Sequence, residues 1–372
     1  MDFQMLCVQP VLGLTPYQPG KPVEELAREL GLDPHRIVKL ASNENPLGPS
    51  PRAMAAMKQA LPETSRYPDG SGFALKRRLA DGLGVAPEQI TLGNGSNDVL
   101  DLIARTFLGH GRSAVFSQHA FAVYPISVQA VGAKARVASA HDGSRGPRYG
   151  HDLGAMLDQI ATDTTVVFIA NPNNPTGTYV SEKELGEFLE ALPRQVLAVV
   201  DEAYFEYVGK QDYPDSIQWL EKYPNLIVTR TFSKAYGLAG LRVGYAVSRP
   251  EIAELLNRVR QPFNVNSVAL TAAEAALHDQ EHLQRTRALN KDGLMFLETS
   301  LKERGLDYIP SVGNFITIDV GREAGPVFEG LLREGVIVRP VANYGLPRHL
   351  RVSVGKTEEN LVFINALDKV LE

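Results

Sequence analysis

The sequence has a single cysteine, Cys7, among its 372 residues. One thiol cannot form an internal disulfide or a thiolate metal cluster, which predicts a reduced protein of the cytoplasm. No apolar run reaches the roughly 18 residues of a membrane span, and the N-terminus lacks the pattern of a secretory signal. The 38 basic and 43 acidic residues give a net charge of −5. This balance argues against nucleic acid or a membrane surface as the partner.

The central part of the chain has the pattern of an α/β protein. Between residues 82 and 248, short and nearly continuous apolar runs alternate with helical patterns. Such runs are typical of parallel strands that are covered on both faces, so a mainly parallel sheet flanked by helices is predicted. The predicted strands are Ile90–Leu92, Thr165–Ala170, Val196–Val200, Leu226–Val228 and Val243–Val247, and the helices between them include Asp98–Leu108 and Glu182–Leu192.

The length suggests about two domains. Residues 1–50 are irregular apart from one amphipathic helix, Val23–Leu30, and are expected to join the smaller domain as a substrate lid. A large domain is predicted for residues 51–265 and a small α+β domain for residues 266–372. The elements predicted near or after this boundary are helices Glu251–Arg258, Ser267–Leu289 and Lys291–Glu303, strand Asn314–Val320, helix Pro326–Glu334, two short strands and helix Glu358–Leu371.

Polar segments follow the predicted strands at their carboxyl ends, where open α/β sheets bind ligands. The turn Gly93–Asp98 combines glycines with a helix start and so predicts an anion site. An ordinary turn with Ser96 or Asn97 as the N-cap is equally compatible with this pattern. The segment Asn171–Gly177 contains two prolines and a glycine, which indicate a rigid turn presenting amides, or simply a hydrophilic loop.

Two further strand ends carry charge. Asp201–Tyr204 places a carboxylate after a wholly apolar strand, where it needs a cationic partner unless it merely caps a helix. Thr229–Arg242 combines hydroxyls, Lys234 and an arginine with small neighbours. Desolvation would lower the pKa of this lysine and suit it to imine chemistry. Together the four strand ends match pyridoxal 5′-phosphate, which needs an anion cradle, a carboxylate for its ring nitrogen, donors for its 3-oxygen and a lysine for its aldehyde.

The same segments resemble a known family. Asn171–Gly177, Asp201–Tyr204 and Thr231–Arg242, in that order, resemble the fold-type I pyridoxal-phosphate-dependent aminotransferases of the aspartate aminotransferase superfamily. That resemblance implies a large domain with a mainly parallel sheet and a smaller α+β domain. Within the superfamily the chain is similar to the histidinol-phosphate aminotransferase family, over essentially its whole length. The segments that carry this closer similarity are Leu14–Pro22, Leu40–Gly48, Arg66–Asp69 and Leu350–Gly355.

The resemblance implies roles for individual residues. Lys234 would form the imine with the cofactor, Asp201 would pair with the ring nitrogen, and Tyr204 and Asn174 would donate to the 3-oxygen. Lys234, Asp201 and Tyr204 are the predicted catalytic residues. Phe121 aligns with the aromatic residue that stacks on the ring, although relatives often have tyrosine and Tyr124 is a second candidate. The residues implied for the cofactor phosphate are Gly95, Ser96, Thr231, Ser233 and Arg242, and Asn97 is a further residue implied for cofactor binding.

The resemblance also implies a homodimer with shared active sites, because Tyr67 aligns with a tyrosine that reaches the neighbouring subunit's cofactor phosphate. For the substrate, Arg351 and Arg339 together suit a dianionic phosphate better than one arginine would. The alternative interpretation is that Arg339 is an ordinary charged residue on the surface. The remaining residues implied for substrate binding are Tyr17, Asn43, Asn45 and Asn174.

The implied reaction is amino transfer between L-histidinol phosphate and 2-oxoglutarate, giving imidazole-acetol phosphate and L-glutamate in histidine biosynthesis. An aromatic amino-acid aminotransferase would use the same framework, with Arg351 binding a carboxylate. A pyridoxal-phosphate-dependent phospho-amino-acid decarboxylase would use the same cradle. A non-enzymatic phosphate sensor would be expected to have lost Lys234. The sequence specifies the cofactor more sharply than the substrate.

Overall fold

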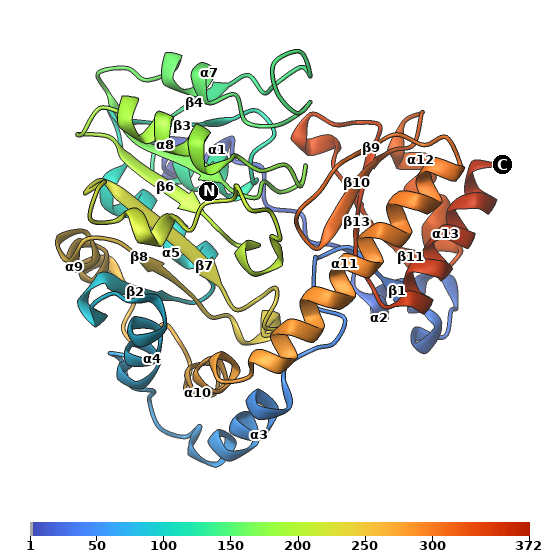
Figure 1. Cartoon of the computed structure of the whole chain (residues 1–372), viewed down its shortest axis with the longest axis horizontal. Helices are drawn as coiled ribbons and strands as arrows, with labels where there is room; N and C mark the ends of the chain where they lie inside the picture. The colour runs from blue at the N-terminus through green and yellow to red at the C-terminus, as the bar shows by residue number, and fades with distance from the viewer. Residues whose placement is uncertain (1–2) are drawn as a thin grey trace.

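Seven strands form the larger sheet of the computed structural model, which describes residues 3–372 (Figure 1). Their order is β2-β8-β7-β6-β5-β3-β4, and β8 alone runs antiparallel to its neighbours. The mainly parallel sheet predicted from the apolar runs is confirmed. The strands are β2 Ile90–Gly93, β3 Ser113–Ser117, β4 Lys134–Ala138, β5 Thr164–Ala170, β6 Leu197–Asp201, β7 Leu226–Thr231 and β8 Gly244–Val247.

The sequence pattern did not reveal β3 and β4. Strand β4 lies at the edge of the sheet and is mostly exposed, so its composition, Lys-Ala-Arg-Val-Ala, is not apolar. Strand β3 is fully buried but short, and serine stands at both of its ends. Neither strand therefore has the long apolar run by which the central strands were found.

Helices cover both faces of this sheet. The core on one face contains side chains of α5 Ser96–Phe107, α6 Val123–Ala130 and α9 Pro250–Val259. The core on the other face contains side chains of α3 Pro51–Ala60, α4 Phe73–Leu83, α7 Leu153–Asp158, α8 Glu182–Ala191 and α10 Ser267–Leu277. The amphipathic pattern of α5 and α9 accounts for their placement, since each buries its apolar stripe against the sheet, whereas α3 packs mainly on α10.

A second, smaller sheet lies beside the first (Figure 1). Its four antiparallel strands are β12 Arg339–Pro340, β13 His349–Ser353, β10 Phe315–Asp319 and β9 Tyr308–Ile309, in that order. A parallel pair, β1 Val38–Lys39 and β11 Val336–Ile337, adjoins it. The helices of this part are α2 Val23–Leu30, α11 Gln280–Glu303, α12 Ala324–Arg333 and α13 Thr357–Leu371. Leu26 of α2 packs with Ile337 and Leu332, so the N-terminal segment joins this part of the molecule.

The predicted break between helices at residue 290 was wrong. Helix α10 ends at Leu277, and α11 runs without interruption from Gln280 to Glu303. The break falls earlier, where the Asp279 side chain caps α11 by accepting a hydrogen bond from the backbone N–H of His282 at 3.2 Å. Asn290 is tolerated inside α11 because its buried amide donates to the Gly313 carbonyl at 3.0 Å.

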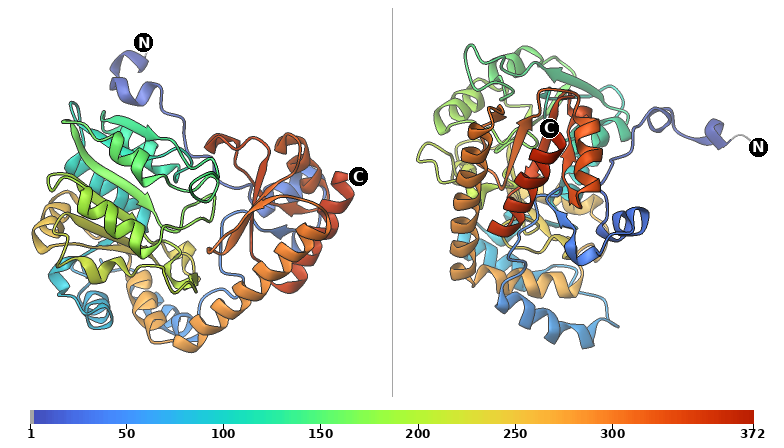
Figure 2. Two further views of the ribbon diagram at one scale, coloured as in Figure 1. Left: turned by 45° about the horizontal axis from the view of Figure 1, so that its top comes forward. Right: turned by 90° about the vertical axis from the view of Figure 1, so that its right-hand side faces the viewer.

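The long helix α11 connects the two parts (Figure 1). Helix α10 still belongs to the core of the large sheet, through Ala269, Ala272 and Ala273. This packing favours a boundary between the two domains later than residue 265. The division into domains stays a prediction. At the other end of the chain, the segment around Phe3–Leu6 extends beyond the body of the molecule (Figure 2), and α1 Gln9–Leu12 lies against α6, where the Gln129 amide donates to the Pro10 carbonyl at 3.0 Å. Among residues 3–372, no helix combines the length and the apolar character that crossing a membrane requires.

Candidate active site

A cavity of about 250 Å³ lies where the carboxyl ends of β5, β6 and β7 face β12, β13 and the N-terminal segment. Most of the predicted site residues line it, although they come from distant parts of the sequence. The predicted residues in its wall are Tyr17, Asn43, Ser96, Asn97, Phe121, Asn174, Asp201, Tyr204, Thr231, Ser233, Lys234, Arg242, Arg339 and Arg351. The convergence expected from parallel strands is therefore observed.

The N-terminus of α5 forms one end of the cavity. Its N-cap is Gly95, with φ of +83° and no side-chain capping bond, so neither Ser96 nor Asn97 is the N-cap. A Cβ atom at Gly95 would collide with the guanidinium of Arg242. Arg242 in turn donates to the Ser233 hydroxyl at 3.4 Å. Uncapped backbone N–H groups beside a guanidinium and a hydroxyl form an anion cradle.

Lys234 projects into the cavity beyond the end of β7. Its Nζ donates to the Ser42 carbonyl at 2.8 Å and lies 5.9 Å from the centre of the Tyr204 ring. Burial, together with the positive charges of Arg351 and Arg242, lowers the pKa of Lys234 to about 7, and the Glu44 carboxylate partly opposes this shift. A neutral amine is therefore available near neutral pH, which is the form that attacks a carbonyl carbon.

Asp201 ends β6 and is 4% exposed. Its Oδ2 accepts from the Tyr124 hydroxyl at 2.9 Å and its Oδ1 accepts from the Thr229 hydroxyl at 3.0 Å. Burial raises the pKa of Asp201, and these two hydrogen bonds oppose that rise. The sequence analysis did not identify Thr229 as a partner, although it is the residue opposite Asp201 on the neighbouring parallel strand.

The structure distinguishes the two aromatic candidates near the cavity. Tyr124 is fully buried, its ring stacks on Phe168 at 4.9 Å, and its hydroxyl is bound to Asp201. Phe121 lines the cavity and packs edge-on against Tyr124 at 5.9 Å. Phe121 is thus the ring available to a ligand, and Tyr124 supports Asp201 from behind.

Asn43 holds Tyr204 in place. The Asn43 amide donates to the Tyr204 hydroxyl at 2.9 Å, and its backbone N–H donates to the Ser353 hydroxyl at 2.8 Å. Its backbone has φ of +54°, a left-handed conformation that asparagine tolerates better than most residues. Burial raises the pKa of Tyr204 to about 12, so this phenol keeps its proton at neutral pH.

Arg351 on β13 and Arg339 on β12 are register partners that line the cavity from the small sheet, whereas the anion cradle belongs to the large one. Arg351 donates to the Asn174 side chain and the Ala41 carbonyl, and its buried Nε has no partner among the described residues. Arg339 is 7% exposed, and its guanidinium lies 5.5 Å from the centre of the Tyr17 ring. Within residues 3–372 neither arginine forms an ion pair with a carboxylate. Two unneutralised guanidiniums favour an anionic ligand at this side of the cavity.

Three predicted site residues do not line the cavity. Gly95 precedes Ser96 as the N-cap of α5, and its lack of a side chain leaves room for the Arg242 guanidinium. Asn45 is buried behind the wall, where its amide donates to the Ala235 carbonyl at 2.9 Å and the Thr286 hydroxyl at 3.1 Å. Tyr67 is 83% exposed and stacks on Phe263 at 4.7 Å, away from this chain's own cavity. Sequence reasoning also missed Ser42, whose only contribution is a backbone carbonyl.

The comparison with known protein families agrees with this geometry. The sequence model of the family described as aminotransferase class I and II matches residues 35–367. The chain belongs to this family. The fold class and the family resemblance predicted from the motifs are therefore confirmed.

Individual relatives of this aminotransferase are also similar over their whole length. The chain is 63% identical to histidinol-phosphate aminotransferase 2 of Methylococcus capsulatus, covering 100% of both chains. It is 59% identical to histidinol-phosphate aminotransferase 2 of Pseudomonas aeruginosa, covering 100% of this chain and 99% of the relative. Histidinol-phosphate aminotransferase from Sinorhizobium meliloti, solved in complex with pyridoxal-5′-phosphate, superimposes with a TM-score of 0.89 at 30% identity. That comparison covers 98% of this chain and 97% of the solved one.

Proposed function

We propose that this chain is a pyridoxal 5′-phosphate-dependent histidinol-phosphate aminotransferase. It would interconvert L-histidinol phosphate and 2-oxoglutarate with imidazole-acetol phosphate and L-glutamate, in the cytoplasm, the compartment that its single cysteine predicts. The identity of 59–63% to full-length relatives of that name supports the proposal. The observation that carries it is the pair of arginines, Arg339 and Arg351, which have no carboxylate partner among residues 3–372 and line a cavity that also contains Lys234 and Asp201.

The residues of the cavity fit the cofactor. A side chain at Gly95 would collide with the Arg242 guanidinium, so glycine at this position lets that cation lie against the start of α5. The N-terminus of α5, Ser233 and Arg242 would hold that phosphate. Asp201 would accept a hydrogen bond from the ring N–H, and Phe121 would pack on the ring face. Tyr204 and Asn174 would donate to the 3-oxygen.

The bound cofactor supplies an aldehyde for the substrate amine and a cationic ring that accepts the electron pair of the broken Cα–H bond. The protein supplies the proton transfers. Lys234, with a pKa of about 7, can take up a proton at Nζ and return it near neutral pH. Asp201, which accepts hydrogen bonds from Tyr124 and Thr229, would hold a negative charge opposite the ring nitrogen. Tyr204 keeps its phenolic proton for donation because its pKa is about 12.

The substrate end of the cavity favours a dianion. An aromatic amino acid presents one carboxylate, for which Arg351 would suffice. Arg339 would then remain almost fully buried without an anionic partner, and burial of an unpaired charge is unfavourable. A phosphate ester satisfies both guanidiniums, because its oxygens can accept from two forked donors.

Competing substrates provide the test of this function. The purified holoenzyme should convert L-histidinol phosphate with 2-oxoglutarate at least about tenfold more efficiently than L-phenylalanine with the same acceptor. Preferred turnover of phenylalanine would support the aromatic aminotransferase instead. Release of carbon dioxide from a phospho-amino acid, without amino transfer, would support the decarboxylase. A colourless protein that gains no visible absorption band with added coenzyme would refute all three.

Arg339→Gln is expected to raise the KM for histidinol phosphate about 10- to 100-fold, because a charge-assisted hydrogen bond contributes roughly 1.5–3 kcal/mol. The kcat should change less, since Arg351 and Arg242 are the arginines whose charges act on Lys234. Arg348→Gln is the matched control, because Arg348 is an exposed arginine that pairs with Asp319 at 3.0 Å. Steady-state kinetics with both substrates measure the effect. An equal loss with phenylalanine would contradict phosphate recognition by Arg339.

We further propose a homodimer in which Tyr67 serves the neighbouring active site. Tyr67 is 83% exposed, its stacking partner Phe263 is 44% exposed, and Phe73 is 62% exposed. The protruding N-terminal segment adds Phe3, 72% exposed, and Leu6, 74% exposed. Apolar side chains this exposed favour a protein interface.

Mixing two variants tests the shared site. Lys234→Ala and Tyr67→Ala subunits, each strongly impaired alone, are unfolded together and refolded. If Tyr67 serves the partner's site, each hybrid dimer has one site with both defects and one intact site, so about a quarter of all sites recover. If Tyr67 serves its own site, or if light scattering shows a monomer, no activity returns above that of the separate variants.

A further inference from the structure

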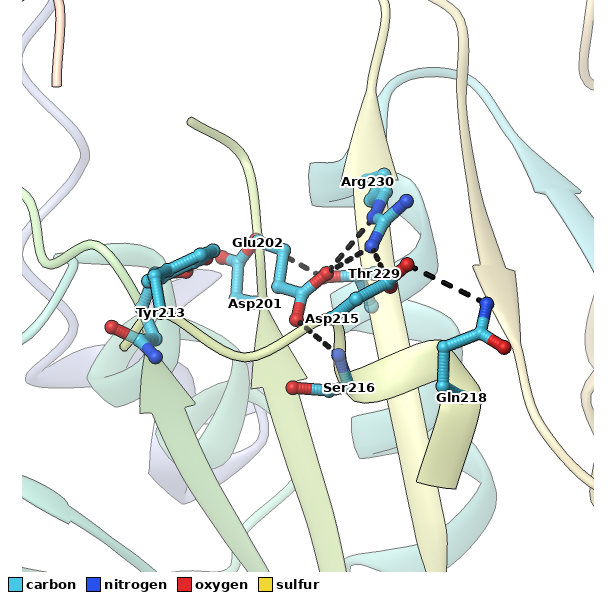
Figure 3. A network of polar contacts seen from close by, with 9 residues as sticks. Asp201, Glu202, Tyr213, Asp215, Ser216, Gln218, Thr229 and Arg230 are labelled. Atoms are coloured by element: carbon cyan, nitrogen blue, oxygen red, sulfur yellow. Dashed lines mark hydrogen bonds and ion pairs between the residues drawn. The ribbon is translucent and has the colours of Figure 1, made fainter. Parts of the chain in front are cut away.

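A buried ion network lies behind the active-site end of the large sheet. Arg230 on β7 donates from Nε at 2.9 Å and from Nη2 at 2.7 Å to the same oxygen, Oε2, of Glu202, which follows β6. The same Nη2 donates to Asp215 at 2.6 Å. Glu202 also accepts from the backbone N–H of Ser216 at 3.1 Å. Figure 3 shows this network spanning the ends of neighbouring strands.

None of these side chains lines the cavity, yet Glu202 and Arg230 each adjoin a residue of the active site in the sequence. Glu202 follows Asp201, and Arg230 follows Thr229 and precedes Thr231. Successive residues of a strand point to opposite faces, so the ion pair and the Asp201 carboxylate occupy opposite faces of the sheet. Asp201 and Thr229 are register partners on β6 and β7. Figure 3 shows Asp201 and Thr229 next to Glu202 and Arg230 at this point.

The network restricts the positions of Arg230 and Glu202. Arg230 is 4% exposed and Glu202 is fully buried. The guanidinium also lies 3.5 Å from the centre of the Phe205 ring, which restricts it on another side. A buried ion pair adds little net stability because desolvation of both ions offsets their attraction, but a forked guanidinium fixes the geometry of its partners. The Glu202 backbone N–H, bound to the Thr229 carbonyl at 2.8 Å, transmits that geometry to the active-site face.

We propose that Arg230 is a positioning residue for amino transfer, acting through Asp201. Its fork holds the ends of β6 and β7 in the register that keeps the Thr229 hydroxyl on Asp201. Its charge neutralises Glu202, which would otherwise place an uncompensated anion next to the Asp201 carboxylate. This inference rests on the proposed function, since it assigns Arg230 to the support of the group that pairs with the ring nitrogen.

A double-mutant cycle tests the assignment. Arg230→Lys keeps the charge but loses the fork, and Asp201→Asn removes the group through which Arg230 acts. Alone, Arg230→Lys is expected to weaken coenzyme affinity, measured by equilibrium dialysis, about 5- to 10-fold, and to slow the half-reaction with L-glutamate by a similar factor. In the Asp201→Asn background the same change is expected to have less than about a twofold effect on either quantity, because residues that act as a unit are not additive.

Arg136→Lys is the matched control. Arg136 links β4 to Ser113 at 3.0 Å and to Asp163 at 2.8 Å in the same sheet, at the edge away from β6 and β7. Its replacement should lower Tm without changing coenzyme affinity or the half-reaction. If Arg230→Lys does not fold, Glu202→Gln replaces it, because it weakens the same fork while keeping the side chain's shape.

The outcomes separate this inference from the proposed function. A parent enzyme that binds coenzyme but does not react with glutamate refutes the proposed function and, with it, this role. A reactive parent in which Arg230→Lys has the same effect in both backgrounds refutes the positioning role alone. So does an Arg230→Lys variant that, like Arg136→Lys, only lowers Tm.

Discussion

Lys234→Ala is expected to lower turnover by at least about 10⁴-fold, the upper end of what a positioned proton-transfer group contributes. The structure gives the reason, because Lys234 is the only lysine among residues 3–372 that lines the cavity. The phosphate cradle of the variant stays intact, so it should still bind coenzyme noncovalently. Borohydride reduction followed by mass spectrometry should label Lys234 in the parent and no lysine in the variant.

Lys76→Ala is a suitable control for this experiment. Burial also lowers the pKa of Lys76, which lies on α4 and outside the cavity. Because Lys76 has a lowered pKa but lies outside the cavity, it should not be labelled by borohydride, and its replacement should not lower turnover. Full activity in Lys234→Ala, or a borohydride label on Lys76, would contradict the assignment.

The same lysine predicts a pH dependence. Because burial lowers the pKa of Lys234 to about 7, its neutral amine predominates above that pH and declines about tenfold for each unit below it. The rate at which the apoenzyme takes up coenzyme covalently should therefore level off just above neutrality. An ordinary lysine, with a pKa near 10.4, would give a rate that rises to about pH 10. Stopped-flow absorbance across this range distinguishes the two profiles.

Asp201→Asn is expected to lower kcat about 10²- to 10³-fold, the typical cost of losing one preorganised electrostatic contact. Asparagine has nearly the same shape but no charge, so it cannot hold the ring nitrogen in its cationic form. Coenzyme should still bind, through Lys234 and the phosphate cradle. Steady-state kinetics and the absorbance of the bound coenzyme measure the two effects separately.

Asp163→Asn is the control for this substitution, because Asp163 also accepts from a serine hydroxyl and an arginine but lies outside the cavity. Its kcat should equal that of the parent. An Asp201→Asn enzyme with parental kcat would exclude Asp201 as the partner of the ring nitrogen.

Although Asp201→Asn should lower kcat, it should raise the thermal stability of the apoprotein. Burial raises the pKa of Asp201 in the folded apoprotein above its unfolded value. For an acid this means that stability falls as the pH rises through the raised pKa, since the unfolded state then releases its proton more readily. Removing the ionisable group should therefore raise the Tm of the apoprotein at neutral pH, as is common where a site trades stability for function. A lower Tm would show that the bonds to Tyr124 and Thr229 outweigh the cost of burying the charge.

The sequence by itself determined the central strands and the chemistry at their ends. Long apolar runs identified β5 and β6, and the polar residues at or just after the ends of these strands include Asp201 and Asn174. The carboxyl ends of parallel strands share one edge of a sheet, so the sequence alone predicts that Lys234 lies near Asp201. These are local patterns, and each can be recognised within about a dozen residues of the sequence.

Only the tertiary structure decided which residues support that chemistry. The amide of Asn43 reaches Tyr204, 161 positions away in the chain, and Arg230 reaches Glu202 across 28. It also placed Tyr124 behind Asp201 and left Phe121 facing the cavity. Contacts between distant segments depend on how sheets and helices pack, and no local pattern of residues encodes that packing.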